Sequence, residues 1–357
     1  MYLDTASSEP LHPAAREAFL AALDRGYADP RRLHASARDA RLILDNAREA
    51  VAEALGVRRD EVSFTSSGTD AVQRGLLGLV RPDTEVAYSA VEHSAVLHAL
   101  SWRDVRARRL PVDHLGRLEV AELGAAEVVA LQHANHEVGT VQPVAAVGDR
   151  TLFMDACASM GRLPLPEGWA AAAGSAHKWG GPAGVGVLLV RKGARWHNPF
   201  PGDDRVDERS TGFENVPAAL AAAAALRATI DDESRLAAQH SALTTQLADA
   251  ARAIPDTEVF LSDGPRLPHL VAFSCLYVDG EALVTELDRR GFAVASGSAC
   301  TASTLEPSHV LAAMGVLTHG NVRVSLGRDT DPAAVHRLAR ELPGVVARLR
   351  SEAGVPQ

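Results

Sequence analysis

Lysine is almost absent from this chain. Of its 36 basic residues only two are lysines, Lys178 and Lys192, and arginine fills the other positions. Arginine can neither form a Schiff base nor readily lose its proton, so a lysine kept in this background is a candidate for covalent chemistry. Lys192 follows Arg191 and is explained by chance. Lys178 stands in SAHKWGG, a loop of small residues, and its neighbours decide its role.

Cysteines, long apolar runs and basic clusters are scarce as well. The three cysteines, at 157, 275 and 300, match neither a disulfide framework nor a zinc pattern, so no metal is expected. The longest apolar run, 218–226, is about half of what a membrane-spanning helix needs. A net charge of −9 without a basic cluster argues against direct binding of nucleic acid. Without a signal-peptide pattern, we expect a cytoplasmic protein that contacts no membrane.

What the chain does contain is an alternation of helices and strands. Helical patterns begin near His12 and cover 37–56, and a long alanine-rich helix is predicted over 217–253. Between them, short apolar segments alternate with helical ones, which predicts an α/β fold with a mostly parallel sheet covered on both faces. These segments are 62–64, 84–90, 127–132, 151–156 and 185–191. We expect a large domain over 12–253 and a smaller one formed by 1–11 and 254–357.

Three segments suit the binding of a cofactor. Gly68 and Thr69 open a helix after a short strand, and the N–H groups of a helix start attract an anion; a well-capped helix without a ligand is the alternative. Asp155 closes the apolar run 151–156, at the strand end where α/β sheets bind ligands. A ring-bearing aldehyde cofactor needs a lysine, an acid for its ring nitrogen and a phosphate cradle. Lys178, Asp155 and the helix start supply all three.

The C-terminal unit holds a candidate nucleophile. Cys300 lies among Ser, Gly, Ala and Thr just before a helix predicted near Pro307, which indicates an exposed loop where a cysteine can be a thiolate. Cys275 is expected in the core of a strand, and Cys157 as a small packing residue near the cofactor. Arg323, on a predicted strand, is a candidate for a bidentate carboxylate clamp, or alternatively for a surface ion pair.

The segments around these residues resemble the cysteine desulfurases, which are fold-type I pyridoxal-phosphate enzymes. The matching motifs cover nearly the whole chain in the family's order: YLDTASSEP, FTSSGTDAV, EHSAVL, HEVGTVQPV, DACASMG, SAHKWGGPAGVG, SGSACTAS and VRVSLGR. The resemblance implies a large domain with a mostly parallel seven-stranded sheet and a smaller α+β C-terminal domain. It also implies a homodimer.

The resemblance further implies a role for each candidate residue. Lys178 would hold pyridoxal 5'-phosphate, Asp155 would pair with its ring nitrogen, and His93 would stack on the ring and assist proton transfer. The Cys300 thiolate would attack the sulfur of L-cysteine, leaving alanine and a persulfide for an acceptor protein. The remaining residues would bind the cofactor (Gly68, Thr69, Ser175, His177 and His136) or the substrate (Arg323 and Asn135).

Several positions depart from the family pattern. His136 replaces an asparagine, Ala158 a glutamine, and Phe213 the threonine of a GTEN motif, for which Ser210 or Thr211 can substitute. Thr5 replaces another asparagine, and ADPRR at 28–32 replaces GNPSS. These changes spare the implied lysine, aspartate, histidine, arginine and cysteine. They alter hydrogen bonds around the ring, and we expect slow turnover or a specialised role.

Two other functions stay open at this level. A related lyase acting on selenocysteine or another sulfur-containing amino acid would keep its activity when Cys300 is replaced. A catalytically degenerate scaffold of the same fold would be colourless and form no alanine from cysteine. For a desulfurase, the sulfur acceptor could serve iron–sulfur assembly, thiolation of tRNA or DNA, or a natural-product pathway.

Overall fold

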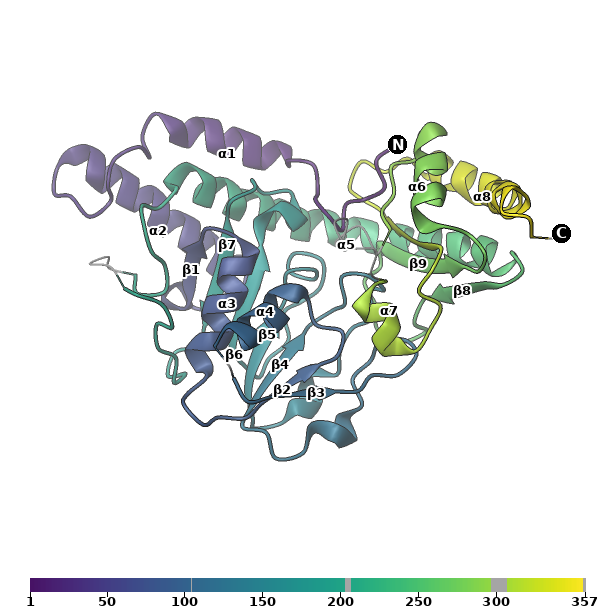
Figure 1. The fold of residues 1–357 in the computed structure, drawn as a ribbon. Helices are drawn as coiled ribbons and strands as arrows, with labels where there is room; N and C mark the ends of the chain where they lie inside the picture. The colour runs from purple at the N-terminus through teal and green to yellow at the C-terminus, as the bar shows by residue number, and fades with distance from the viewer. Residues whose placement is uncertain (104, 203–206, 297–306, 356–357) are drawn as a thin grey trace.

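The computed structural model describes residues 1–103, 105–202, 207–296 and 307–355 (Figure 1). A seven-stranded sheet has the order β1-β7-β6-β5-β4-β2-β3. Strand β7 is antiparallel to β1 and β6, and the other adjacent pairs are parallel. The predicted α/β class with a mostly parallel sheet is therefore confirmed. The strands are β1 (Val62–Thr65), β2 (Val86–Ser89), β3 (Ala107–Leu110), β4 (Val128–Gln132), β5 (Thr151–Asp155), β6 (Trp169–Ser175) and β7 (Gly186–Val190).

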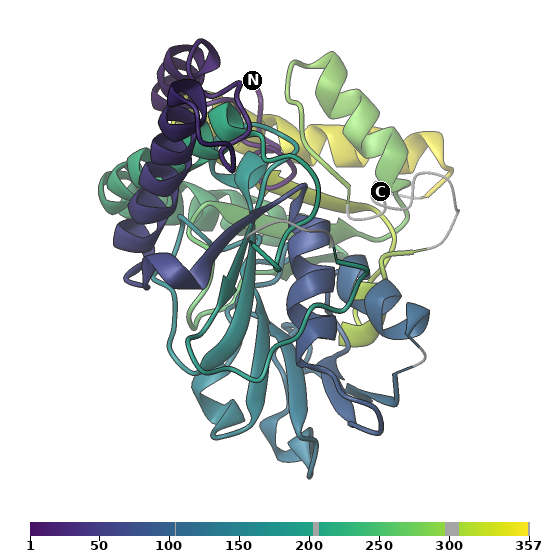
Figure 2. The same cartoon turned by 90° about the vertical axis from the view of Figure 1, so that its left-hand side faces the viewer.

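Helices cover both faces of this sheet, which is why β4 and β7 are buried along their whole length. On one face α1 (Pro13–Leu23) and α2 (Ala35–Leu55) pack on α5 (Val216–Arg252). On the other lie α3 (Gly68–Leu79) and α4 (Ser94–Trp102). Figure 2 shows the teal strands between the purple helices and the blue ones. Alternate side chains of β5 serve the two cores: Leu152 and Met154 pack under α5, and Phe153 packs under α3.

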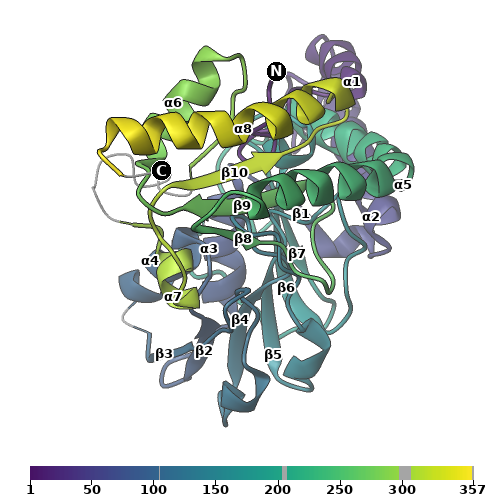
Figure 3. The same ribbon diagram turned by 90° about the vertical axis from the view of Figure 1, so that its right-hand side faces the viewer.

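A second, antiparallel sheet has the order β10-β9-β8. It consists of β8 (Thr257–Phe260), β9 (Leu270–Cys275) and β10 (Asn321–Ser325), with α6 (Gly280–Arg289), α7 (His309–Met314) and α8 (Pro332–Glu352) around it. Figure 3 shows α8 across this sheet and α5 beside it. The C-terminal part of α5 contributes Leu243 and Leu247 to the second core, and Leu3 joins them from the N-terminal segment. The domain limits at 11/12 and 253/254 stay a prediction.

Two of the large-sheet strands were not predicted from the sequence. Strand β6, WAAAAGS, is mostly alanine, and β3, ARRL, is half arginine, whereas strand signals rest on β-branched and aromatic residues. Pairing with β5 on one side and β7 on the other keeps β6 a strand although alanine has a low strand propensity.

Among the described residues, no helix is long and apolar enough to span a bilayer, and no group of three or more His, Cys, Asp and Glu side chains could hold a metal.

Candidate active site

A cavity of about 290 Å³ lies at the carboxyl ends of the parallel strands, between the large sheet and β10. Ligands of open α/β sheets bind at this edge. Nine of the eleven site residues expected from the sequence line it, coming from segments far apart in the chain. They are Gly68, Thr69, His93, His136, Asp155, Ser175, His177, Lys178 and Arg323.

Lys178 reaches the cavity from the turn that follows β6. The turn Ala176–Trp179 ends at Gly180, whose φ of +76° favours glycine. It is anchored to α5, because the Trp179 indole donates to the carbonyl of Ala222 (3.0 Å) and the Trp179 carbonyl accepts from Thr229 (2.7 Å). A rigid support therefore carries the lysine. Lys192, by contrast, is exposed in the turn after β7 and does not line the cavity.

Asp155 ends β5, the strand next to β6, and so meets Lys178 at the same sheet edge. Its carboxylate is buried, lines the cavity and accepts from the backbone N–H of Cys157 at 2.9 Å. A buried carboxylate that still faces a cavity is suited to pair with a protonated ring nitrogen, because the pair would offset the cost of burial.

The start of α3 forms the other wall. Ser67 caps the helix, and Gly68 and Thr69 follow in its first turn. A Cβ on Gly68 would lie 2.5 Å from the Cβ of Ser175, so only glycine lets the helix start approach β6 this closely. Ser175 Oγ in turn lies 3.1 Å from His177 Nδ1. A helix N-terminus beside a hydroxyl and an imidazole is a suitable cradle for a phosphate.

Two histidine rings meet inside the cavity. His93 caps α4, and its Nδ1 accepts from the N–H of Ala95 (3.1 Å), so the neutral ring carries its proton on Nε2. The ring of His136 contacts it edge-on, with centroids 5.1 Å apart. Burial lowers the pKa of His93 and brings that of His136 well below its ordinary value. Both rings are therefore neutral at physiological pH, and His93 is suited to accept a proton.

Arg323 does form an ion pair, with Asp4, but its side chain is buried and the pair is not on the surface; its role as a carboxylate clamp stays a prediction. It donates to the carbonyl of His136 (2.8 Å), to Asp4 Oδ1 (2.9 Å) and to Ser7 Oγ (2.5 Å). Within the described residues its buried Nε has no hydrogen-bond partner. A side-on carboxylate could use this N–H and a neighbouring one.

Asn135 is the described site residue that the cavity does not include. Its side chain is fully buried: Oδ1 accepts from the N–H groups of Glu137 and Val138, and Nδ2 donates to the carbonyl of Val91. The amide thereby shapes the turn that presents His136. A contact of Asn135 with substrate stays a prediction.

Neither described cysteine is suited to be a thiolate. Cys275 is buried in β9, as expected, and burial raises the pKa of its thiol. Cys157 lines the cavity, and burial together with the Asp155 carboxylate raises the pKa of its thiol well above the usual range. Cys300, the predicted nucleophile, lies outside the described residues.

The described residues on both sides of 297–306 are bonded to the site. Before this range, Ala295 pairs through its backbone with Arg323. After it, Ser308 donates to Glu137 Oε2 at 2.6 Å, next to His136.

The N-terminal segment is also part of the site, which the sequence did not predict. Ala6 and Ser7 line the cavity, and the Ala6 carbonyl accepts from Lys178 Nζ at 2.8 Å. The only indication of this role in the sequence is weak, a run of small residues before Pro10 in the motif YLDTASSEP.

Among the positions that depart from the family pattern, Ala158 also lines the cavity and offers only a methyl group there. Phe213 is exposed, and Thr211 accepts from Arg74 at 3.0 Å.

Comparison with known proteins gives a consistent result. The family model "Aminotransferase class-V" matches residues 1–338. "Cysteine desulfurase IscS" of Dictyoglomus turgidum is 32% identical, over 98% of this chain and 95% of that protein. "IscS-like cysteine desulfurase" of Mycobacterium tuberculosis is 34% identical, over 99% and 98%. A solved "NifS-like protein" superposes with a TM-score of 0.88 at 26% identity, over 98% of this chain and all of that one.

Proposed function

The chain belongs to the class-V aminotransferase family, among relatives that are cysteine desulfurases, and we propose that it is itself a cysteine desulfurase. With pyridoxal 5'-phosphate it would convert L-cysteine to L-alanine and leave a persulfide on Cys300. The observation that carries the proposal is the convergence of one lysine, one buried aspartate and one helix N-terminus on a single cavity.

The residues present fit this cofactor. The close approach of Gly68 to Ser175 makes a cradle that a Cβ would fill, beside the start of α3. We propose that the phosphate would lie in this cradle, that Asp155 would pair with the ring nitrogen, and that Lys178 would hold the aldehyde carbon. When bound, pyridoxal phosphate withdraws electrons from an amino acid joined to it.

Side chains of the protein would bind the substrate, transfer protons and accept the sulfur. Arg323 would orient the substrate carboxylate through its Nε–H, for which the described part of the chain provides no hydrogen-bond partner, and neutral His93 would accept a proton. The Cys300 thiolate would take the sulfur atom, so that a new S–S bond replaces the C–S bond. The electron pair of the broken bond would stay with the carbon fragment. A proton delivered by Lys178 Nζ would then complete alanine.

The test is to incubate the purified, cofactor-loaded protein with L-cysteine and to quantify alanine and protein persulfide. We expect both products in equal early amounts, and neither from Cys300→Ser. Alanine or another product formed at an unchanged rate by Cys300→Ser would support a related lyase. A colourless protein that forms no alanine would support a degenerate scaffold, against which the convergence of the site residues argues.

The cellular location, the oligomeric state and the sulfur acceptor are part of the proposal as well. We propose a cytoplasmic homodimer that passes its persulfide sulfur to an acceptor protein. Analytical ultracentrifugation tests the dimer. Genes adjacent to this one are the direct route to candidate acceptors.

A further inference from the structure

We infer that Glu9 is a positioning residue: its buried ion pair with Arg162 holds the N-terminal segment, residues 2–9, against both Lys178 and Arg323. The kinetic part of this inference rests on the proposed function. The structural part concerns only how the segment is held and is testable without turnover.

The N-terminal segment bonds to Lys178 and to Arg323, which both line the cavity. The Ala6 carbonyl accepts from Lys178 Nζ (2.8 Å), and the Glu9 N–H donates to the carbonyl of His177 (2.8 Å). Asp4 and Ser7 accept from the Arg323 guanidinium. A shift of this segment would therefore move the amine and the guanidinium together.

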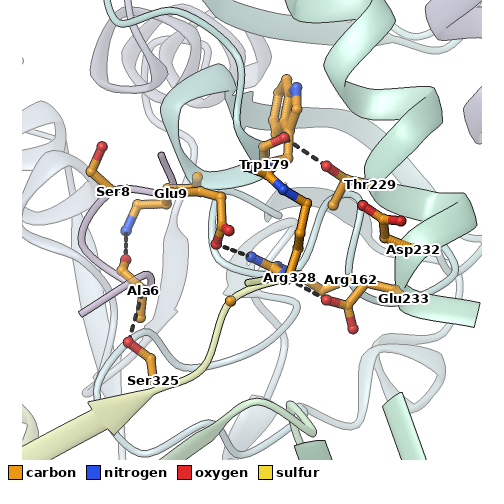
Figure 4. Close-up of polar contacts among 12 residues, drawn as sticks. Ala6, Ser8, Glu9, Arg162, Trp179, Thr229, Asp232, Glu233, Ser325 and Arg328 are labelled. Carbon is orange, nitrogen blue, oxygen red and sulfur yellow. Dashed lines mark hydrogen bonds and ion pairs between the residues drawn. The ribbon is translucent and has the colours of Figure 1, made fainter. Parts of the chain in front are cut away.

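Backbone bonds join Leu3 of this segment to Ala293 and Ser325, and at its other end a buried carboxylate, that of Glu9, joins it to the part of the protein built around the large sheet. Glu9 Oε2 accepts from Arg162 at 2.6 Å, and both side chains are buried. Arg162 follows the Asp155 strand and is held on its other side by Glu233 of α5, as Figure 4 shows. Against the larger effect of burial, the charge and the backbone N–H of Arg328, after β10, also act on the Glu9 carboxylate and lower its pKa. The segments that carry Asp155, Arg323 and the Lys178 contact thus meet at Glu9.

The charges around Arg162 make the inference testable without unfolding the protein. The carboxylates of Glu9 and Glu233 both face the Arg162 guanidinium. Burial and the charge of Arg162 lower the pKa of the neighbouring His240 to about 4, and they also lower the pKa of His269. Burial also raises the pKa of Glu9. When either glutamate is replaced by glutamine, Arg162 still forms an ion pair with the other glutamate, and this buried pair has no net charge. The variant therefore avoids the large free-energy penalty of an unpaired buried charge.

Glu9→Gln and Glu233→Gln are therefore matched variants. Each removes one carboxylate from the same guanidinium, but only Glu9 belongs to the N-terminal segment. Positioning predicts that backbone hydrogen exchange in residues 2–9 rises in Glu9→Gln and stays at the wild-type level in Glu233→Gln. A purely structural role of the ion pairs predicts the same change in both variants.

With the holoenzyme, Glu9→Gln should raise the KM for L-cysteine by about tenfold or more, because the Arg323 guanidinium is misplaced, with a smaller change in kcat. Glu233→Gln should keep both constants near wild type. Unchanged exchange in Glu9→Gln, or equal KM values in the two variants, would overturn the inference. If the wild-type protein forms no alanine, the proposed function fails while the exchange comparison still decides the role of Glu9.

Discussion

Gly68→Ala is the sharpest single-residue test of the phosphate cradle. The added Cβ would lie 2.5 Å from the Cβ of Ser175, 2.6 Å from its Oγ and 3.3 Å from the sulfur of Cys157. These atoms belong to the end of β6 and the turn after β5, so a flexible side chain cannot simply move aside. The helix start must withdraw from the strand, at a cost of about 1–3 kcal/mol.

We expect this cost to appear mainly as weaker cofactor binding, because a phosphate needs the helix start and Ser175 in contact, whereas the empty protein can relax. A cost of this size corresponds to a roughly 5-fold to 150-fold higher Kd for pyridoxal phosphate. The measurement is titration of the apoprotein followed by visible absorbance.

Gly344→Ala is the control, since a Cβ there meets nothing within 4 Å inside helix α8. It should leave the Kd unchanged and stabilise the protein by up to about 1 kcal/mol. A wild-type Kd for Gly68→Ala would refute the placement of the phosphate at this helix start.

Two further predictions concern single side chains. Cys157→Ser should keep most of the alanine and persulfide formation, because the Cys157 thiol is held protonated by burial and Asp155; loss of persulfide in this variant, measured by mass spectrometry, would contradict our choice of nucleophile. Burial lowers the pKa of His133 from 6.5 to about 4, so the unfolded chain binds the proton first. The contribution of His133 to stability is then present above pH 6.5 and is lost as the pH falls through 4, by up to about 3 kcal/mol. The difference in unfolding free energy between wild type and His133→Gln, measured by urea titration, should shrink over this range; a constant difference would show that the histidine titrates normally.

Features of the fold that local sequence patterns determine could be predicted from the sequence, whereas features that depend on contacts between distant segments could not. Helices α1, α2 and α5 and five of the seven large-sheet strands follow from local patterns that agree with the fold. The alanine strand β6 has no such pattern, and its position is set by contacts with β5 and β7. Seven of the nine site residues that line the cavity lie at a strand end, at a helix start or in the turn directly after β6, where the sequence pattern places them. The other two, His136 in the turn after β4 and Arg323 within β10, were assigned to the site through the family resemblance.

The remaining features arise from contacts between distant segments. The ring of His136 and the amide of Asn135 are adjacent in the chain, but only the first lines the cavity, because the turn that joins them is closed by the Asn135 side chain. The link from Glu9 to Arg162 joins residues 153 positions apart and leaves no periodic signal. Likewise, no local pattern indicated that Asp4 and Ser7 hold Arg323.

The most direct measurement of the central claim is borohydride reduction of the cofactor-loaded protein, followed by digestion and mass spectrometry. We predict a single modified peptide, with the pyridoxyl group on Lys178. Modification of Lys192 or of the N-terminal amine instead, or a protein that retains no ring after reduction, would contradict it.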